Sequence, residues 1–181
     1  MRMGVRLLFF LSLFCFVNFQ SVPENCIETP VVSQHKTAYK VVGVKDGDTI
    51  VLLMNGKAET VRFAHIDCPE KKQAFGTKAK QFVSDRCFGK MVTLKIDPKN
   101  KYDRYKRLIA EVILNNGANL NKELVKNGLA WHFKAYSKDA SYDVLEKSAR
   151  RKRVGLWSEP KPIAPWDWRK IKRQITAKKG K

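Results

Sequence analysis

The chain has 181 residues, of which 44% are hydrophobic, enough for one core of ordinary domain size. Charged residues make up 29% and aromatic residues 10%, and this composition excludes a wholly disordered or collagen-like chain. Lysine and arginine number 36 against 17 acidic residues, so the formal net charge is +19. No hydrophobic core requires such a charge, and self-repulsion makes it costly. A polyanionic partner is therefore the first expectation.

The N-terminal segment has the pattern of a secretory signal peptide. Arg2 and Arg6 precede a strongly apolar stretch of 11 residues, 7–17, whereas a membrane-spanning helix needs about 20 residues. We therefore predict a signal peptide over residues 1–21 and an exported protein, either secreted or periplasmic. An uncleaved anchor is the less favoured alternative. Cleavage would remove two arginines and no acidic residue, which leaves a net charge of +17, and a flexible segment over 22–37 is expected to follow.

The cysteines are consistent with one disulfide. Cys15 would leave with the signal peptide, so Cys26, Cys68 and Cys87 would remain in a compartment that permits disulfides. A Cys68–Cys87 bridge is preferred because both residues lie within the predicted folded region, and a bridge from Cys26 stays open. The sequence contains no CxxC motif and no Cys/His cluster at zinc spacing, so a transition-metal site is not expected.

The first half of the folded region predicts antiparallel strands. Runs of β-branched and aromatic residues occur at 38–44, 48–54 and 58–65. The second and third runs are joined by Asn55-Gly56, a dipeptide typical of a two-residue hairpin turn. These runs therefore predict three consecutive antiparallel strands.

The rest of the region alternates helices and strands. Apolar residues at three- and four-residue spacing predict a helix over 72–88. Strand-like runs follow at 91–96 and 107–114, then a short helix that Gly128 ends, and a final helix over 140–153. Five short strands with a helix between the third and the fourth define an α+β chain. We predict a five-stranded OB-fold β-barrel with about three helices.

The C-terminus is basic. The segment 171–181 contains five lysines and arginines and no acidic residue. We predict a folded domain over 38–169 and a basic tail over 170–181 that trails into solvent.

Acidic residues gather where predicted strands end. Asp46 and Asp48 flank Gly47 in a turn between two strands; alone, an Asp-Gly turn is common and solvated. The segment 62–70 adds an arginine on a strand, an aspartate at the end of the strand and a glutamate three residues later, and 103–107 (DRYKR) offers further arginines. Acids flanked by arginines in a basic protein suggest a cation and a phosphate held side by side. Calcium suits this set because it prefers oxygen ligands.

Five motifs occur in a fixed order: DGDT, RxxxIDxPE, DRYxR, NxELVxxGLAW and GLW. In this order and with these gaps the chain resembles the staphylococcal nuclease (thermonuclease) family over about 38–169. The resemblance implies an OB-fold barrel with three helices and a calcium-dependent nuclease that hydrolyses DNA and RNA with little sequence preference. We expect DNA and RNA as substrates, and a mature monomer without a membrane partner.

The resemblance also implies roles for individual residues. The calcium ligands would be Asp48, Asp67 and the main-chain carbonyl of Cys68; the catalytic residues would be Arg62, Glu70 and Arg107; the nucleotide would be bound by Tyr136, with Lys106 nearby. Tyr136 is equally well explained as a packing tyrosine.

The chain departs from the family pattern at three positions. Lys106 stands where glycine is common, which reduces the freedom of the backbone and adds a cation. Cys68 replaces a small residue in the acidic loop. His65 stands at a strand position that is more often apolar, and a structural or surface histidine is the favoured interpretation.

Two other classes of protein compete with a nuclease. A catalytically silent OB-fold module binds nucleic acid through a basic groove and aromatic platforms, but it has no reason to combine three acids with two arginines. A cationic exported protein acting on anionic membranes or surface polysaccharide explains the charge and leaves the acidic loop without a role. A nuclease is therefore the favoured function.

Overall fold

The computed structural model describes residues 37–179. The predicted signal peptide over 1–21 lies outside the described residues, as do Cys26 and all of the predicted segment 22–37 except its last residue. Within 37–179, no helix combines the length and the apolar character needed to cross a membrane.

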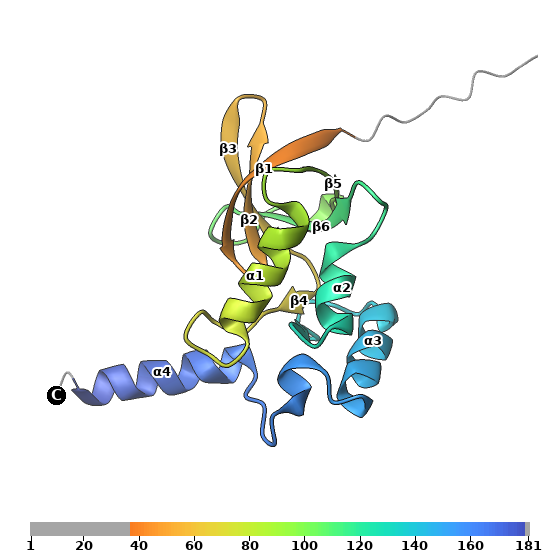
Figure 1. Cartoon of the computed structure of the whole chain (residues 1–181). Helices are drawn as coiled ribbons and strands as arrows, with labels where there is room; N and C mark the ends of the chain where they lie inside the picture. Colours follow the sequence, from red (N-terminus) through yellow and green to blue (C-terminus); the bar gives the residue numbers. More distant parts are fainter. Residues whose placement is uncertain (1–36, 180–181) are drawn as a thin grey trace, which may run out of the picture. The chain divides into compact units, whose positions relative to one another are not determined.

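Five strands close into a barrel (Figure 1). They are β1 (Ala38–Asp46), β2 (Thr49–Met54), β3 (Lys57–Phe63), β5 (Met91–Lys95) and β6 (Leu108–Leu114). Their order around the barrel is β1-β2-β3-β6-β5, with β3 and β6 parallel and the other pairs antiparallel. Closure removes exposed sheet edges, and the predicted five-stranded OB-fold barrel is confirmed.

Two local features set the register of the barrel. Asn55 and Gly56 have φ values of 51° and 75°, the left-handed backbone that a two-residue type I′ hairpin requires, so the predicted β2–β3 turn is confirmed. The parallel pairing places Val61 opposite Leu108. Since Arg107 directly precedes Leu108, this register brings the predicted second arginine alongside β3.

Four α-helices occur in residues 37–179: α1 (Gly76–Cys87), α2 (Leu120–Lys126), α3 (Ala140–Arg151) and α4 (Pro165–Lys179). Two 3₁₀ helices also occur: η1 (Pro98–Asn100) between β5 and β6, and η2 (Gly155–Ser158) between α3 and α4. The first three α-helices match the predicted ones, although α1 begins four residues later than the predicted start at 72. Phe75, at the N-cap of α1, has φ 66°, a left-handed conformation that cannot continue a helix backwards.

The fourth helix was not predicted. It begins with Pro165 at its first position, where the fixed φ of proline favours a helix and its missing N–H is not needed. Residues 170–179 of the predicted basic tail 170–181 belong to it, and positions 170–178 are exposed. The helix therefore continues through the predicted boundary between residues 169 and 170.

A small second sheet connects the acidic loop to the C-terminal half of the domain. It consists of β4 (Ile66–Asp67) and β7 (Trp131–His132), with Asp67 opposite Trp131. The GLAW and GLW motifs meet close by, because a Cβ on Gly128 would lie 2.1 Å from the carbonyl oxygen of Val154. Only glycine permits such an approach at φ +62°.

The predicted Cys68–Cys87 bridge is wrong, because both residues are buried free thiols. Cys68 and Ala79 both lie next to Gly47, so Cys68 is level with the first turn of α1. Cys87 is the last residue of α1, and its thiol donates to the carbonyl of Val83 at 3.1 Å. The eight residues from Ala79 to Cys87 rise about 12 Å along a helix, beyond the roughly 7 Å that a disulfide allows between Cα atoms.

We predict that Lys106→Gly stabilises the fold by about 1 kcal/mol, because Lys106 has a left-handed backbone that is costly for any residue with a Cβ. Its φ is 60°, in the turn between Asp103 and Arg107. The measurement is the urea unfolding midpoint. Lys101→Gly is the matched control, since Lys101 has φ −66° and glycine there should only increase the entropy of the unfolded chain. Equal destabilisation by both substitutions would contradict the prediction.

Candidate active site

Three carboxylates gather at one end of the barrel from two segments, the β1–β2 turn and the acidic loop that follows β3. Asp48 lies in the β1–β2 turn, Asp67 ends β4, and Glu70 lies in the loop before α1. Asp48 and Asp67 are buried, at 7% and 1% exposure, whereas the side chain of Glu70 is 43% exposed. We call these three residues the acid cluster.

Arg62 lies between the two aspartates. Its Nη1 is 2.8 Å from Oδ2 of Asp48, and its Nη2 is 2.8 Å from Oδ1 of Asp67. Burial opposes the charge of this guanidinium, but the two carboxylates outweigh that effect and hold the pKa of Arg62 above its ordinary value. The forked guanidinium suits this position because it contacts two acceptors at once.

A second arginine, which sequence reasoning missed, closes the other side of the acid cluster. The side chain of Arg169, from α4, places Nη2 2.7 Å from Oδ2 of Asp67 and Nη1 2.9 Å from Oε1 of Glu70. Although partial burial opposes its charge, these two carboxylates raise the pKa of Arg169. Arg169 lies about 100 residues further along the chain than the acids it contacts, in a segment without an acidic motif.

Asp67 is the most enclosed of the three acids. Burial raises its pKa, and the hydrogen bond from Arg169 and the charge of Arg62 only partly offset this effect. The two arginines therefore favour the ionised form of this carboxylate against the effect of burial.

Cys68 takes part through its main chain. Its N–H donates to Oδ2 of Asp48 at 2.7 Å, which connects the β1–β2 turn to the acidic loop. Burial raises the pKa of the Cys68 thiol well above its usual range, so the sulfur stays protonated. A neutral, buried thiol does not compete with the carboxylates for a cation.

The loop that carries Glu70 is fixed by two residues that the motifs did not single out. Gln73 accepts from the N–H of Glu70 at 3.1 Å and donates to the carbonyl of Ile163 at 2.6 Å. A Cβ on Gly76 would lie 1.9 Å from the carbonyl oxygen of Glu70, so only glycine lets α1 begin directly against this loop. Gly76 therefore determines how close the main chain of Glu70 lies to α1.

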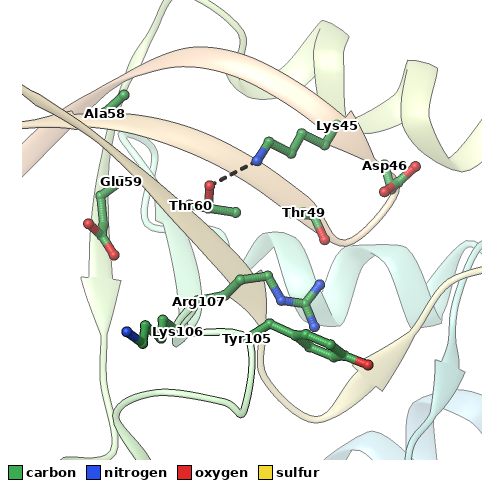
Figure 2. A pocket seen from close by; sticks show the side chains of 9 residues that line it. All are labelled: Lys45, Asp46, Thr49, Ala58, Glu59, Thr60, Tyr105, Lys106 and Arg107. Carbon is green, nitrogen blue, oxygen red and sulfur yellow. Dashed lines mark hydrogen bonds between the residues drawn. The ribbon is translucent and has the colours of Figure 1, made fainter.

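A polar groove of about 530 Å³ adjoins the acid cluster. Figure 2 shows Arg107 in this groove with its guanidinium directed towards Thr49 and Asp46, the residues on either side of the Gly47-Asp48 pair. The groove is lined by Lys45, Asp46, Thr49, Ala58, Glu59, Thr60, Tyr105, Lys106 and Arg107. The predicted residues Arg107 and Lys106 therefore share one surface next to the acids.

Asp103 holds Arg107 in place. Its Oδ2 accepts from Nε of Arg107 at 2.7 Å, and its Oδ1 accepts from the main-chain N–H groups of Tyr105 and Arg107. Slight burial opposes ionisation, but these hydrogen bonds lower the pKa of Asp103. The DRYKR loop is thus a local turn built around one carboxylate.

The remaining predicted residue lies apart from these groups. The side chain of Tyr136 is 81% exposed, and its ring packs on Phe133 with centroids 4.9 Å apart. It is outside both the acid cluster and the lining of the groove. The contacts of His65 are packing and hydrogen-bond contacts within the domain. Its ring lies 4.9 Å from that of Tyr142, and its Nδ1 lies 2.9 Å from the hydroxyl of Ser137.

Comparison with known proteins identifies the family. The model of the staphylococcal nuclease homologue family matches residues 60–159. An uncharacterized endonuclease of Haemophilus influenzae is 43% identical over 139 residues, which cover 76% of each chain. A micrococcal nuclease of Shigella flexneri is 38% identical over 147 residues, covering 76% of this chain and 83% of its own. The chain belongs to the staphylococcal nuclease family. Membership confirms the predicted resemblance and, with it, the enzyme class, a thermonuclease-like phosphodiesterase.

The acid cluster has the donor chemistry of a site for a hard divalent cation in this family. It offers the carboxylate oxygens of Asp48, Asp67 and Glu70, and Cys68, the source of the predicted carbonyl ligand, lies next to Asp67 in the chain with its N–H on Asp48. Oxygen ligands of this kind suit calcium, and no nitrogen or sulfur ligand takes part. The residues present therefore fit the predicted cofactor.

A second group of metal-ligating side chains lies elsewhere, made of His65, Glu111 and Asp139, with ligand atoms within 4.8 Å of one another. Glu111 already accepts from Tyr142 and Asn119 and is 3.1 Å from the ammonium of Lys95. Its charge is balanced by protein groups, and this cluster is accounted for as a structural network.

We predict that Gly76→Ala lowers nuclease activity by roughly 10²-fold, because the added methyl group must displace the main chain at Glu70, and displacements of about 1 Å at an active site have effects of that size. The measurement is kcat together with the unfolding midpoint. Gly43→Ala is the matched control, since a Cβ there meets Val51 at an ordinary 3.4 Å. Normal activity in Gly76→Ala would show that the loop position is not critical.

Proposed function

We propose that this member of the staphylococcal nuclease family is an exported, calcium-dependent nuclease that hydrolyses phosphodiester bonds of DNA and RNA with little sequence preference. One observation carries the proposal: Arg62 lies between the carboxylates of Asp48 and Asp67, Arg169 connects Asp67 to Glu70, and a groove that presents Arg107 lies next to them. An acid cluster for a cation beside arginines for a phosphate is what phosphodiester hydrolysis needs, because both the ground state and the transition state are anionic.

Asp48, Asp67 and the carbonyl of Cys68 would hold the calcium ion. When bound, calcium supplies positive charge to the non-bridging oxygens of the phosphate. Arg62 and Asp67 hold each other in place through the ion pair at 2.8 Å. The hydrogen bond from the Cys68 N–H fixes the carboxylate of Asp48 relative to the acidic loop. These contacts orient the ligands before any substrate arrives.

Arg62 and Arg107 would hold the scissile phosphate. A guanidinium can contact two phosphate oxygens at once, which a lysine ammonium cannot do with the same geometry. Arg107 is anchored by Asp103 through Nε and Nη2, so its orientation is already set. Lys106, on the same groove surface, adds a cation that is less constrained.

Glu70 would act on the attacking water. It is the most exposed carboxylate of the acid cluster, and its main chain is fixed by Gln73 and Gly76. A carboxylate held in place but open to solvent can orient a water molecule and accept its proton.

Little sequence preference is supported by the lining of the groove, which is mainly charged and polar. Contacts to phosphate position a nucleic acid without reading its bases. The exposed half of α4 adds Lys170, Lys172 and Arg173, which strengthen attraction to long polyanions in a salt-dependent way. Export, to the periplasm or the medium, is supported by the signal-peptide pattern over residues 1–21.

The proposal is tested by incubating purified protein with plasmid DNA and with RNA, first in calcium and then in excess chelator. Because the acid cluster needs a divalent cation to act on phosphate, we expect both substrates to be degraded in calcium and to survive in chelator. Full activity in chelator would contradict the calcium requirement. Retarded migration without cleavage would instead identify a catalytically silent nucleic-acid-binding module.

We predict that Glu70→Gln slows turnover by about 10²-fold or more, the usual contribution of a positioned acid or base, while calcium and nucleotide binding are largely retained. The measurements are kcat on a dinucleotide-sized substrate and calcium affinity by calorimetry. Glu123→Gln on α2 makes the same chemical change at a residue that pairs only with Lys126 among the contacts of residues 37–179, and its kcat should be normal. An unchanged rate in Glu70→Gln would remove this carboxylate from the mechanism.

A further inference from the structure

We infer that Arg169 is an internal cation that competes with calcium for the acid cluster, and that calcium binding displaces its side chain from Asp67. The inference rests on the proposed function and adds regulation of the same site. It assigns a role to α4, which lies beyond residues 60–159 that match the family model.

The oxygens contacted by the two arginines support this role. Arg62 contacts Oδ2 of Asp48 and Oδ1 of Asp67, so Arg62 itself leaves the other oxygen of each aspartate open to a cation. On Asp48 this oxygen, Oδ1, accepts only from the hydroxyl of Thr49 at 3.1 Å among the contacts of residues 37–179. On Asp67 the corresponding oxygen, Oδ2, is taken by Arg169 at 2.7 Å. Arg169 therefore covers a ligand atom that calcium needs.

The charge of the acid cluster supports the same conclusion. Three carboxylates and two arginines leave a net charge of −1, and a divalent ion added to this set would make it +1. Asp67 is buried, and like charges repel strongly where water is excluded. The cluster accommodates calcium at lower cost if one arginine leaves.

Arg169 is the arginine that can leave more easily. Its side chain is 39% exposed, whereas that of Arg62 is 14% exposed, so water can solvate the guanidinium of Arg169 once it is released. Arg62 projects from a barrel strand, whereas Arg169 reaches the cluster from a helix at the surface. Arg169 is therefore the arginine that calcium displaces.

The helix itself is held against the site, so the movement is confined to the side chain. Trp166, one turn before Arg169, stacks on Phe133 at 5.3 Å and meets Trp131 edge-on at 5.6 Å. Gln73 binds the carbonyl of Ile163 just before α4 begins. These contacts hold α4 in place, so the side chain of Arg169 returns to the acid cluster when calcium dissociates.

The test is calorimetric titration of calcium into the purified protein and its variants. Removing a competitor should tighten calcium binding, so Arg169→Gln should bind calcium at least about fivefold more tightly, the lower end of ordinary coupling between two ligands. Arg169→Lys keeps the charge but loses the two-point contact, and its affinity should lie between those of Arg169→Gln and the wild type. In chelator, Arg169→Gln should melt about 2–4 °C lower, equivalent to about 1 kcal/mol for a domain of this size. Calcium should remove most of this difference.

Lys170→Gln is the matched control, because Lys170 is the next residue of α4 and pairs with the exposed Asp167 at 3.1 Å. Its calcium affinity should equal that of the wild type. Unchanged or weaker calcium binding in Arg169→Gln would overturn the inference, since a purely structural ion pair would lower stability without raising affinity. Cleavage of plasmid by the wild type is scored separately, so a failed nuclease and a failed competition give different results.

Discussion

The electrostatic balance of the acid cluster is the constraint on which the rest of the site depends. Asp48 and Asp67 are nearly inaccessible to water, and two buried carboxylates repel each other unless cations lie between them. Arg62 satisfies this requirement through one guanidinium that touches both. Because Arg62 is on β3, Asp48 in the β1–β2 turn and Asp67 at the end of β4, the balance depends on closure of the barrel.

Backbone geometry brings the acids to that arginine. The main chain of the Glu70 loop approaches α1 so closely that only Gly76 fits between them, and the GLAW and GLW segments approach each other in the same way at Gly128. β7 in turn pairs with β4 at Asp67. The close approaches at these glycines therefore fix the acidic loop against the C-terminal half of the domain, which explains how residues so far apart in sequence come to lie together.

The parts of the fold that were predictable are those set by local chemistry. The Asn55-Gly56 hairpin and the β-branched strands follow from neighbouring residues alone. The α1 start and the free thiols depended on which segments touch across the domain: Phe75 takes a left-handed backbone, and Cys68 and Cys87 lie near opposite ends of one helix. Local periodicity contains no information about either feature.

The same distinction applies to the candidate site. DGDT and IDCPE singled out the acids because each motif is short and local, and the structure brings the β1–β2 turn and the end of β4 together. Arg169 was not found, since a basic residue in a basic C-terminal segment has no local signature, and its role exists only through contacts with acids about 100 residues away. In a chain of charge +19, lysines and arginines are too numerous for composition to single out the one that matters.

The three arginines of the site differ in how many of their guanidinium nitrogens already contact a carboxylate. This difference determines how readily each can bind a phosphate. Arg62 has both terminal nitrogens on the acid cluster, and Arg169 likewise contacts two carboxylates. Arg107 is held by Asp103 through Nε and Nη2, and its Nη1 has no partner among the contacts of residues 37–179. A phosphate entering the groove can therefore bind Arg107 without breaking an existing ion pair, whereas Arg62 must first share its donors. The acid cluster and its two arginines together have a net charge of −1, which repels an anion, so Arg107 is the most accessible of the three guanidinium groups for a phosphate in the groove.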